Sequence, residues 1–201
     1  MNPHSLAQHF ATEAYNNAWA NHRLLRACAQ LSDEEFAATR VSFFPSLKAT
    51  LNHIVTVDWF YVEMLERSRD GLPCHENPGR HFAPEEPFAD CAALSKAQHE
   101  SDRKLIAYCE SLDDSRLDDP VTTLRSKGPV TDRVRRILAH LFEHQIHHRG
   151  QAHAMLAGTR VKPPQLDEFF CTGEAHLRAT DFAELGFTEE RIWGPRSVVP
   201  A

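Results

Sequence analysis

Apolar residues recur at helical spacing over four long stretches of the chain, and this pattern predicts four long helices. The stretches cover about residues 5–31, 46–67, 88–112 and 132–157. Within each stretch the apolar residues lie three or four positions apart, so they form one face that can be buried. Four such helices bury their apolar faces against one another. The predicted fold class is therefore all-α, a four-helix bundle.

Shorter signals predict how these helices are joined. Residues 32–35 read Ser-Asp-Glu-Glu, the S-x-x-E form of a capping box, which predicts a short helix. Glycine and proline are frequent over residues 68–87, which predicts a long loop. Residues 121–130 predict a small hairpin. Thr131 and Gly158 are the expected caps of the last long helix.

The chain after the fourth helix is predicted to be a separate unit. We expect residues 1–160 to form the bundle and residues 161–201 to form a C-terminal extension. The aromatic and aliphatic residues that make the extension too apolar to be disordered are Phe169, Phe170, Phe182, Leu185, Phe187 and Trp193. The extension should pack on the bundle or on a neighbouring subunit, with a turn over residues 191–195.

Charge and composition narrow the range of partners. The chain has 22 lysines and arginines against 28 acidic residues, a net charge of -6, which argues against nucleic acid as a partner. No run approaches the ~18 apolar residues of a membrane span, and no signal peptide is expected at the start. The five cysteines form no C-x-x-C pair, which is typical of reduced thiols, so the expected location is cytoplasmic.

The apolar stripe of the fourth predicted helix is interrupted by two histidines and a glutamine. Steps of four and three positions lead through Ile137, Leu141, His144, His148, Gln151 and Met155. Residues four apart lie one turn apart on one face, so His144 and His148 can bind one metal ion between them. Two imidazoles that face a core need polar partners, and a metal ion satisfies both.

His53 is the best candidate for a third ligand, because it too interrupts an apolar stripe on another helix. Three neutral imidazoles leave an open position on Zn²⁺, which is typical of catalytic rather than structural sites. Zinc is the expected ion, and nickel or iron would accept the same donors. A pair formed by His140 and His144 is a competing assignment. The alternative without any metal is that these histidines are partly exposed or paired with carboxylates.

Two further side chains are expected beside this site. Gln151 continues the ligand stripe and is expected either to bind a water or substrate or to be a satisfied buried amide. His147 points about 100° away from His148, so it should lie behind the ligands or in solvent. Acceptors that orient the imidazoles, or that simply face water, are expected among Asn52, Asp58 and Glu143.

Several of these motifs resemble the DinB/YfiT-like family. The matching segments are LNHI at residues 51–54, LAHLFEHQIHHRGQ at 138–151, PPQLD at 163–167 and YNNAWAN at 15–21. The likeness covers about residues 8–170. It implies a four-helix bundle, often a homodimer, with one divalent metal ion held by three histidines.

Carried over by position, the ligands that the resemblance implies are His53, His144 and His148. Characterised members of the family include metal-dependent thiol transferases and a thiol-dependent maleylpyruvate isomerase, so the resemblance implies a small thiol as co-substrate. Nothing in the family pattern implies DNA binding. The sequence itself contains no H-E-x-x-H helix, no G-x-S-x-G elbow, no P-loop and no dinucleotide fingerprint.

Two classes of function follow from these observations. The first is an enzyme, a metal-dependent transferase or isomerase that uses a small thiol, with a metal-dependent hydrolase as its variant. The second is a non-catalytic metal-binding module of a stress response. A substrate-sized apolar pocket beside the metal would favour the enzyme. A closed site with a fourth ligand, such as His140 or His147, would favour the module.

Overall fold

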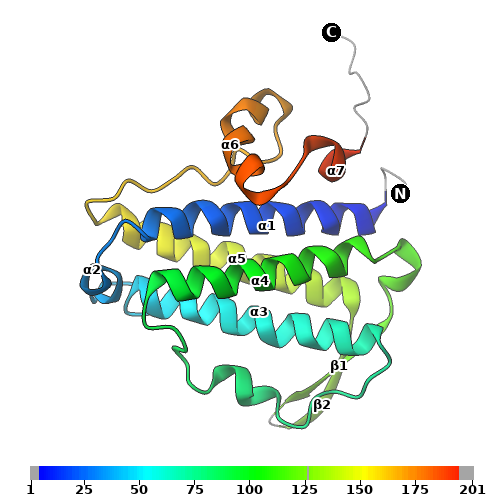
Figure 1. Cartoon of the computed structure of the whole chain (residues 1–201). Coiled ribbons are helices and arrows are strands. Elements are labelled where there is room, and N and C mark those ends of the chain that lie inside the picture. Colours follow the sequence, from blue (N-terminus) through cyan, green and yellow to red (C-terminus); the bar gives the residue numbers. More distant parts are fainter. Residues whose placement is uncertain (1–4, 126, 195–201) are drawn as a thin grey trace.

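The computed structural model describes residues 5–125 and 127–194. Its long helices are α1 (Leu6–Cys28), α3 (Leu47–Arg69), α4 (Cys91–Glu110) and α5 (Val134–Ala157). They lie side by side in Figure 1, where α1 packs on α4 and α5, and α3 packs on the same two helices. The four helices therefore enclose one core, and the predicted all-α four-helix bundle is confirmed.

The bundle contains one long crossover connection. Residues 70–90 return along the outside of the bundle and include the 3₁₀ helix η1 (Pro78–Phe82), as Figure 1 shows. Asn52 ties the first turns of α3 to Phe88, three residues before α4: its amide donates to the Phe88 carbonyl at 3.0 Å and accepts from the Phe88 N–H at 2.9 Å. Both helices therefore run in the same direction.

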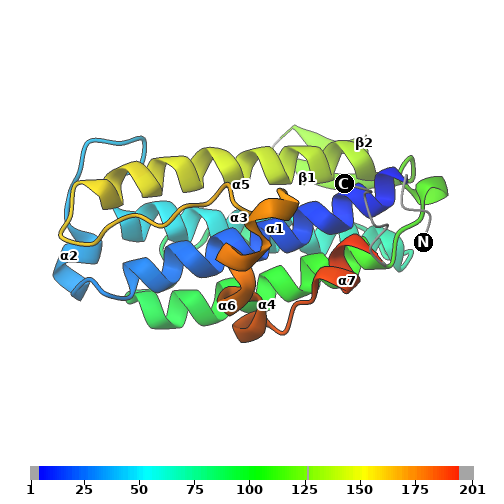
Figure 2. The ribbon, with the colours of Figure 1, turned by 90° about the horizontal axis from the view of Figure 1, so that it is seen from above.

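A capping box begins the short helix α2 (Asp33–Ala37), as predicted. The Glu35 N–H donates to the Ser32 hydroxyl at 3.2 Å, and the Ser32 N–H donates to the Glu35 carboxylate at 2.8 Å. Residues 38–46 then form a loop, which is closed by a hydrogen bond of 2.8 Å from the Arg40 N–H to the Pro45 carbonyl. In Figure 2 this loop lies beside the C-terminal end of α5.

The predicted hairpin consists of β1 (Pro120–Arg125) and β2 (Gly128–Arg133), which are antiparallel; the 3₁₀ helix η2 (Asp114–Arg116) precedes it. The prediction that Thr131 caps the last helix is wrong, because β2 continues through it. Its hydroxyl bonds the Thr122 hydroxyl across the strand pair at 2.9 Å. The first free N–H of α5, that of Val134, donates instead to the Asp119 carbonyl at 3.1 Å.

Apolar side chains form two clusters in the bundle. The larger lies toward the start of α1 and includes Trp19, Leu65, Leu105, Leu138 and Leu141. The smaller lies toward the end of α1 and includes Leu24, Leu47, Ile54, Leu94 and Leu156. Tyr15 and Trp19 are both buried in the larger cluster.

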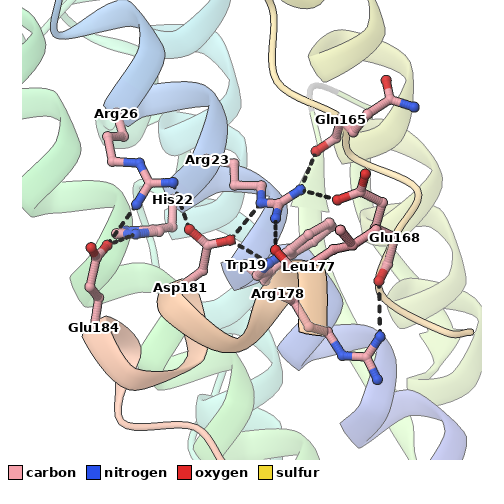
Figure 3. A network of polar contacts seen from close by, with 10 residues as sticks. All are labelled: Trp19, His22, Arg23, Arg26, Gln165, Glu168, Leu177, Arg178, Asp181 and Glu184. Atoms are coloured by element: carbon pink, nitrogen blue, oxygen red, sulfur yellow. Dashed lines mark hydrogen bonds and ion pairs between the residues drawn. The ribbon is translucent and has the colours of Figure 1, made fainter. Parts of the chain in front are cut away.

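The C-terminal extension packs across α1 through α6 (Ala175–Leu185) and α7 (Glu189–Trp193), after the 3₁₀ helix η3 (Thr172–Glu174). Figure 3 shows the contact, in which the buried Asp181 accepts three hydrogen bonds from α1. Their donors are Arg23 Nε and Arg26 Nη2, each at 2.6 Å, and Trp19 Nε1 at 3.2 Å. Two arginines and a buried carboxylate thus attach α6 to the bundle.

The extension also holds itself together around a buried arginine. Arg178 is 1 % exposed, and it donates to the Glu189 carboxylate and to the carbonyls of Glu168 and Cys171 at 2.9–3.0 Å. Of the turn predicted over residues 191–195, Arg191 to Trp193 complete α7, and Pro195 is outside the described residues, as are residues 196–201. The division of the chain at residue 160 stays a prediction.

Replacing Asp181 should release the extension. Asp181→Ala removes the buried carboxylate that accepts hydrogen bonds from Trp19, Arg23 and Arg26, so the free energy of unfolding should fall by about 3 kcal/mol. Amide hydrogen exchange in α6 should accelerate more than exchange in the bundle helices. Urea denaturation and exchange mass spectrometry would measure both effects.

Asp118→Ala is the matched control. This carboxylate is half exposed and pairs with Arg133 and Arg135 at the surface, so its removal should cost less than about 1 kcal/mol. Unchanged protection of the α6 amides in Asp181→Ala would contradict the role assigned to this contact.

Candidate metal centre

The three histidines predicted as ligands lie together between α3 and α5. His53 extends from α3, and His144 and His148 extend from successive turns of α5. Nε2 of His53 and Nε2 of His144 are 3.0 Å apart, and the centroids of the three rings are separated by 4.4–5.0 Å. One ring nitrogen from each residue lies within 4.8 Å of the other two.

Helical periodicity explains why these side chains meet. Ile137, Leu141 and Met155, which share the predicted stripe with the two α5 histidines, are buried in the bundle. The stripe therefore faces the interior of the bundle, and His144 and His148 lie on this face, where they contact His53 of α3. His53 occupies the matching height on α3, which lies against α5.

Burial keeps these imidazoles neutral. Desolvation, with a smaller contribution from neighbouring imidazoles, lowers the pKa of His53 to about 4 and that of His144 to about 3. Desolvation also lowers the pKa of His148. All three rings are therefore uncharged at neutral pH, which is the form that binds a metal ion.

The donor set fits one divalent ion. The 3.0 Å between two Nε2 atoms is close to the roughly 3.3 Å that separates two ligands of a tetrahedral zinc ion. Three imidazole nitrogens suit zinc, nickel or iron. His140, the competing partner of His144, is exposed, and the centroid of its ring lies 6.2 Å from that of His144. In the described residues His144 is grouped with His53 and His148 instead.

Gln151 connects two of the histidines. Its side-chain oxygen lies 2.9 Å from Nδ1 of His148, and its side-chain nitrogen lies 2.9 Å from Nε2 of His147. An Nδ1–H of His148 that donates to this amide leaves Nε2 as the nitrogen that can bind a metal. His147 itself is exposed and lies behind the cluster.

The acceptors that the sequence suggested for the imidazoles are engaged elsewhere. Asn52 binds the backbone at Phe88, and Asp58 binds two glutamines of other helices. Glu143 faces solvent. Of the two roles considered for these residues, orienting the ligands is found for none of them, and facing water is found for Glu143, whereas Asn52 and Asp58 are buried. The contact that orients an imidazole comes from Gln151.

The loop of residues 38–46 covers the cluster, and sequence patterns did not predict it. The Phe44 ring lies 4.4 Å from the His53 ring and 5.5 Å from the His148 ring, centroid to centroid. Phe43 lies 6.2 Å from His148, while 76 % of its surface stays exposed. A loop has no regular spacing of apolar residues, so its position over the histidines could not be predicted from such a pattern. The pair of adjacent phenylalanines is the indication that its sequence offered.

A pocket of about 350 Å³ lies beside the cluster, between this loop and α5. Its lining residues are Arg40, Val41, Ser42, Gln151, Ala154, Met155 and Gly158. Because Gln151 lines the pocket and also contacts His148, one side chain separates the pocket from the predicted metal ligand. The volume is within the range of small-molecule sites.

A layer of buried polar side chains crosses the bundle behind the histidines, between the two apolar clusters. We call this set the polar layer: Asn17 and Asn21 of α1, Asp58 of α3, Gln98 and Asp102 of α4, and Gln145 and Arg149 of α5. Every helix of the bundle contributes to it. Gln145 directly follows His144, and Arg149 directly follows His148. This position next to a predicted ligand is what the sequence offered to identify the two residues.

Hydrogen bonds connect the polar layer from α5 through α1 to α4. Nη1 of Arg149 donates to the side-chain oxygens of Asn17, Asn21 (3.0 Å) and Gln145 (3.1 Å). Both asparagines donate to Oδ1 of Asp102, at 3.3 and 2.9 Å. The amides of Asn17 and Asn21 thus link the buried guanidinium of Arg149 to the buried carboxylate of Asp102 through hydrogen bonds.

The second carboxylate of the layer joins α3 to α4 and α5. Asp58 accepts hydrogen bonds from Gln98, at 2.7 Å, and from Gln145. Desolvation raises the pKa of Asp58 to about 7 and that of Asp102 to about 6, and it lowers the pKa of Arg149 to about 10. Arg149 therefore remains charged at neutral pH inside the bundle.

A second group of three possible donors consists of His22, Asp181 and Glu184. Arg26 binds both carboxylates, at 2.6 and 2.8 Å, as Figure 3 shows. Because a guanidinium already occupies the space between them, this group is an ion-pair network rather than a cation site.

The described chain contains no helix with the length and apolar character needed to cross a membrane. The model of the DinB family matches residues 5–177. No curated protein matches the chain significantly. The matched segment contains the bundle helices, the three clustered histidines and the polar layer, and it ends within α6.

Loss of a single histidine should empty the predicted site. His53→Ala and His148→Ala should each reduce bound metal from about one ion per chain to a small fraction, because two imidazoles bind a divalent ion far more weakly than three. Elemental mass spectrometry of untagged protein would measure the content, and circular dichroism would show that the helices persist. His176→Ala, at an exposed position in the extension, is the control. Full metal content in both ligand variants would disprove the assignment.

Metal retention should extend below the usual imidazole pKa of 6.5. Protons compete with a metal ion only when the pH falls to the pKa of the ligand, and burial lowers the pKa of His53 to about 4. The protein should therefore keep its metal at about pH 6 and lose it as the pH approaches 4. Dialysis at stepped pH followed by elemental analysis would test this. Half-release at or above pH 6.5 would contradict it.

Proposed function

The chain belongs to the DinB family, and on this basis we propose that it is a metal-dependent transferase or isomerase that uses a small thiol. One observation carries the proposal: three clustered imidazoles lie beside a substrate-sized pocket, and they share Gln151 with it. An open three-ligand cluster next to a pocket supports an enzyme, whereas a closed four-ligand site would support a non-catalytic module.

In this proposal His53, His144 and His148 hold one divalent ion, with zinc as the first expectation. The ion would supply the positive charge that lowers the pKa of a thiol and polarises an electrophile. The chain supplies the positions of the ligands and the shape of the pocket. Gln151 holds His148 through Nδ1, which keeps its ring turned toward the other two.

The covering loop has a separate role. Phe44 packs on two of the three imidazoles, so it excludes water from one side of the cluster. Exclusion of water strengthens electrostatic interactions at the site and protects a reactive thiolate from competing reactions. The exposed Phe43 and Val41 place further apolar surface at the entrance.

The lack of a suitable general base favours thiol transfer over hydrolysis. Among the described residues, Asp58 faces the polar layer and Glu143 faces solvent, so neither carboxylate contacts the cluster. Hydrolysis needs a group that removes a proton from water, whereas a thiol is already acidic enough to ionise near a cation. The metal-dependent hydrolase remains the alternative reaction. The homodimer implied by the family resemblance stays a prediction.

The proposal predicts metal-dependent conjugation of thiols. Zinc-, nickel- and iron-loaded protein would be mixed with 2-mercaptoethanol and monobromobimane, whose bromide leaves as the new carbon–sulfur bond forms. Conjugation should be saturable, at least about tenfold above the uncatalysed rate, and absent in His148→Ala. His176→Ala should retain the full rate.

Two outcomes would contradict thiol transfer. Loaded protein without any acceleration over buffer, but with metal-dependent cleavage of 4-nitrophenyl acetate, would favour the hydrolase. Loaded protein inactive in both assays, while the metal stabilises the fold, would favour the non-catalytic module.

A further inference from the structure

The pocket beside the three histidines is lined by one charged side chain, that of Arg40. The chain as a whole has a net charge of -6, yet no carboxylate is among the lining residues of this pocket. Val41, Ala154 and Met155 supply an apolar wall. The pocket thus combines one cationic end with an apolar surface.

Arg40 is held in place by neutral groups. Its Nη1 and Nη2 donate to the backbone carbonyls of Ala38 and Glu35, each at 2.7 Å. A guanidinium carries five N–H donors, so these two bonds orient it and leave donors for a ligand. An arginine that is already oriented loses little side-chain entropy when a ligand binds.

The Arg40 guanidinium also forms no direct ion pair among the described residues; an acidic neighbour, the Glu35 carboxylate, interacts with it only through its charge. The Glu35 carboxylate, which belongs to the same short helix as the carbonyl that Arg40 binds, pairs with Arg160 at 3.0 Å. Within residues 5–125 and 127–194 no carboxylate forms an ion pair with Arg40. Most other arginines of the described chain do have such a partner. The positive charge is therefore available to an anion in the pocket.

We propose that this pocket binds the carboxylate end of an elongated apolar substrate, with Arg40 as its anchor. The inference rests on the proposed function, because it assigns the substrate class of the same site. Arg40 would bind the carboxylate, the apolar body would lie along Met155 and Ala154, and the reacting end would reach the histidines past Gln151. Arginine is suited to this role because its planar fork matches a carboxylate.

Hexanoate and 1-hexanol are matched probes for this pocket, since they share a chain length and differ in charge. Wild-type protein should bind hexanoate about tenfold more tightly than hexanol, by calorimetry or NMR titration. Arg40→Gln should remove this preference by weakening hexanoate alone, with hexanol affinity unchanged. Arg40→Lys should keep part of the preference. Arg135→Gln removes an exposed charge at the start of α5 and is the control.

The same titrations in His148→Ala separate Arg40 from the metal, because a carboxylate can also bind a metal ion directly. A preference for hexanoate that persists in this variant supports the pocket. The inference is overturned if neither probe binds, if both bind equally, or if the preference disappears with the metal. It is also overturned if Arg40→Gln weakens both probes and Arg40→Lys restores nothing.

Failure of this inference can be distinguished from failure of the proposed function. An Arg40-dependent preference without any thiol conjugation would refute the proposed reaction and leave the anion pocket. Thiol conjugation with no Arg40-dependent preference would refute the pocket and leave the reaction.

Discussion

A buried arginine charge at mid-length of the bundle is the constraint on which the rest of this structure depends. Arg149 is 5 % exposed, and an ionised group removed from water costs several kcal/mol unless hydrogen bonds and opposite charge compensate it. Each bundle helix therefore has to present polar side chains at this height. Asn17 and Asn21 do so on α1, Asp58 on α3 and Asp102 on α4. The polar layer sets the rotation and the axial position of each helix more narrowly than apolar packing alone.

The predicted metal site follows from this constraint. Gln145 and Arg149 come directly after His144 and His148, and successive residues of a helix point about 100° apart. Because the side chains of Gln145 and Arg149 point into the polar layer, those of His144 and His148 must point toward α3. Asp58 orients α3 in the same way, and His53 lies on the side that faces α5. The two apolar clusters above and below the layer keep water away from it.

The irregular segments shape the surroundings of the bundle. The loop of residues 38–46 lies over the histidines and lines the adjacent pocket. The extension lies across α1 instead, held by Asp181 and the arginines of that helix. The α3–α5 side, where the histidines lie, is thus covered by a short loop closed on itself, while the larger extension is attached elsewhere. In our proposal residues 38–46 exclude water from one side of the cluster and line the substrate pocket.

The sequence by itself determined the four long helices, the hairpin and the capping box at Ser32, because apolar period and caps are local properties of the chain. It also selected the three histidines that the structure brings together. Thr131 was misassigned because a strand pair competes for it. Only the tertiary structure decided the partners of Asp58 and Arg149 and the place of Phe44 over the imidazoles. The physical reason is that those contacts join residues far apart in the sequence. The spacing of apolar residues along one helix does not determine which other helices or loops become its neighbours.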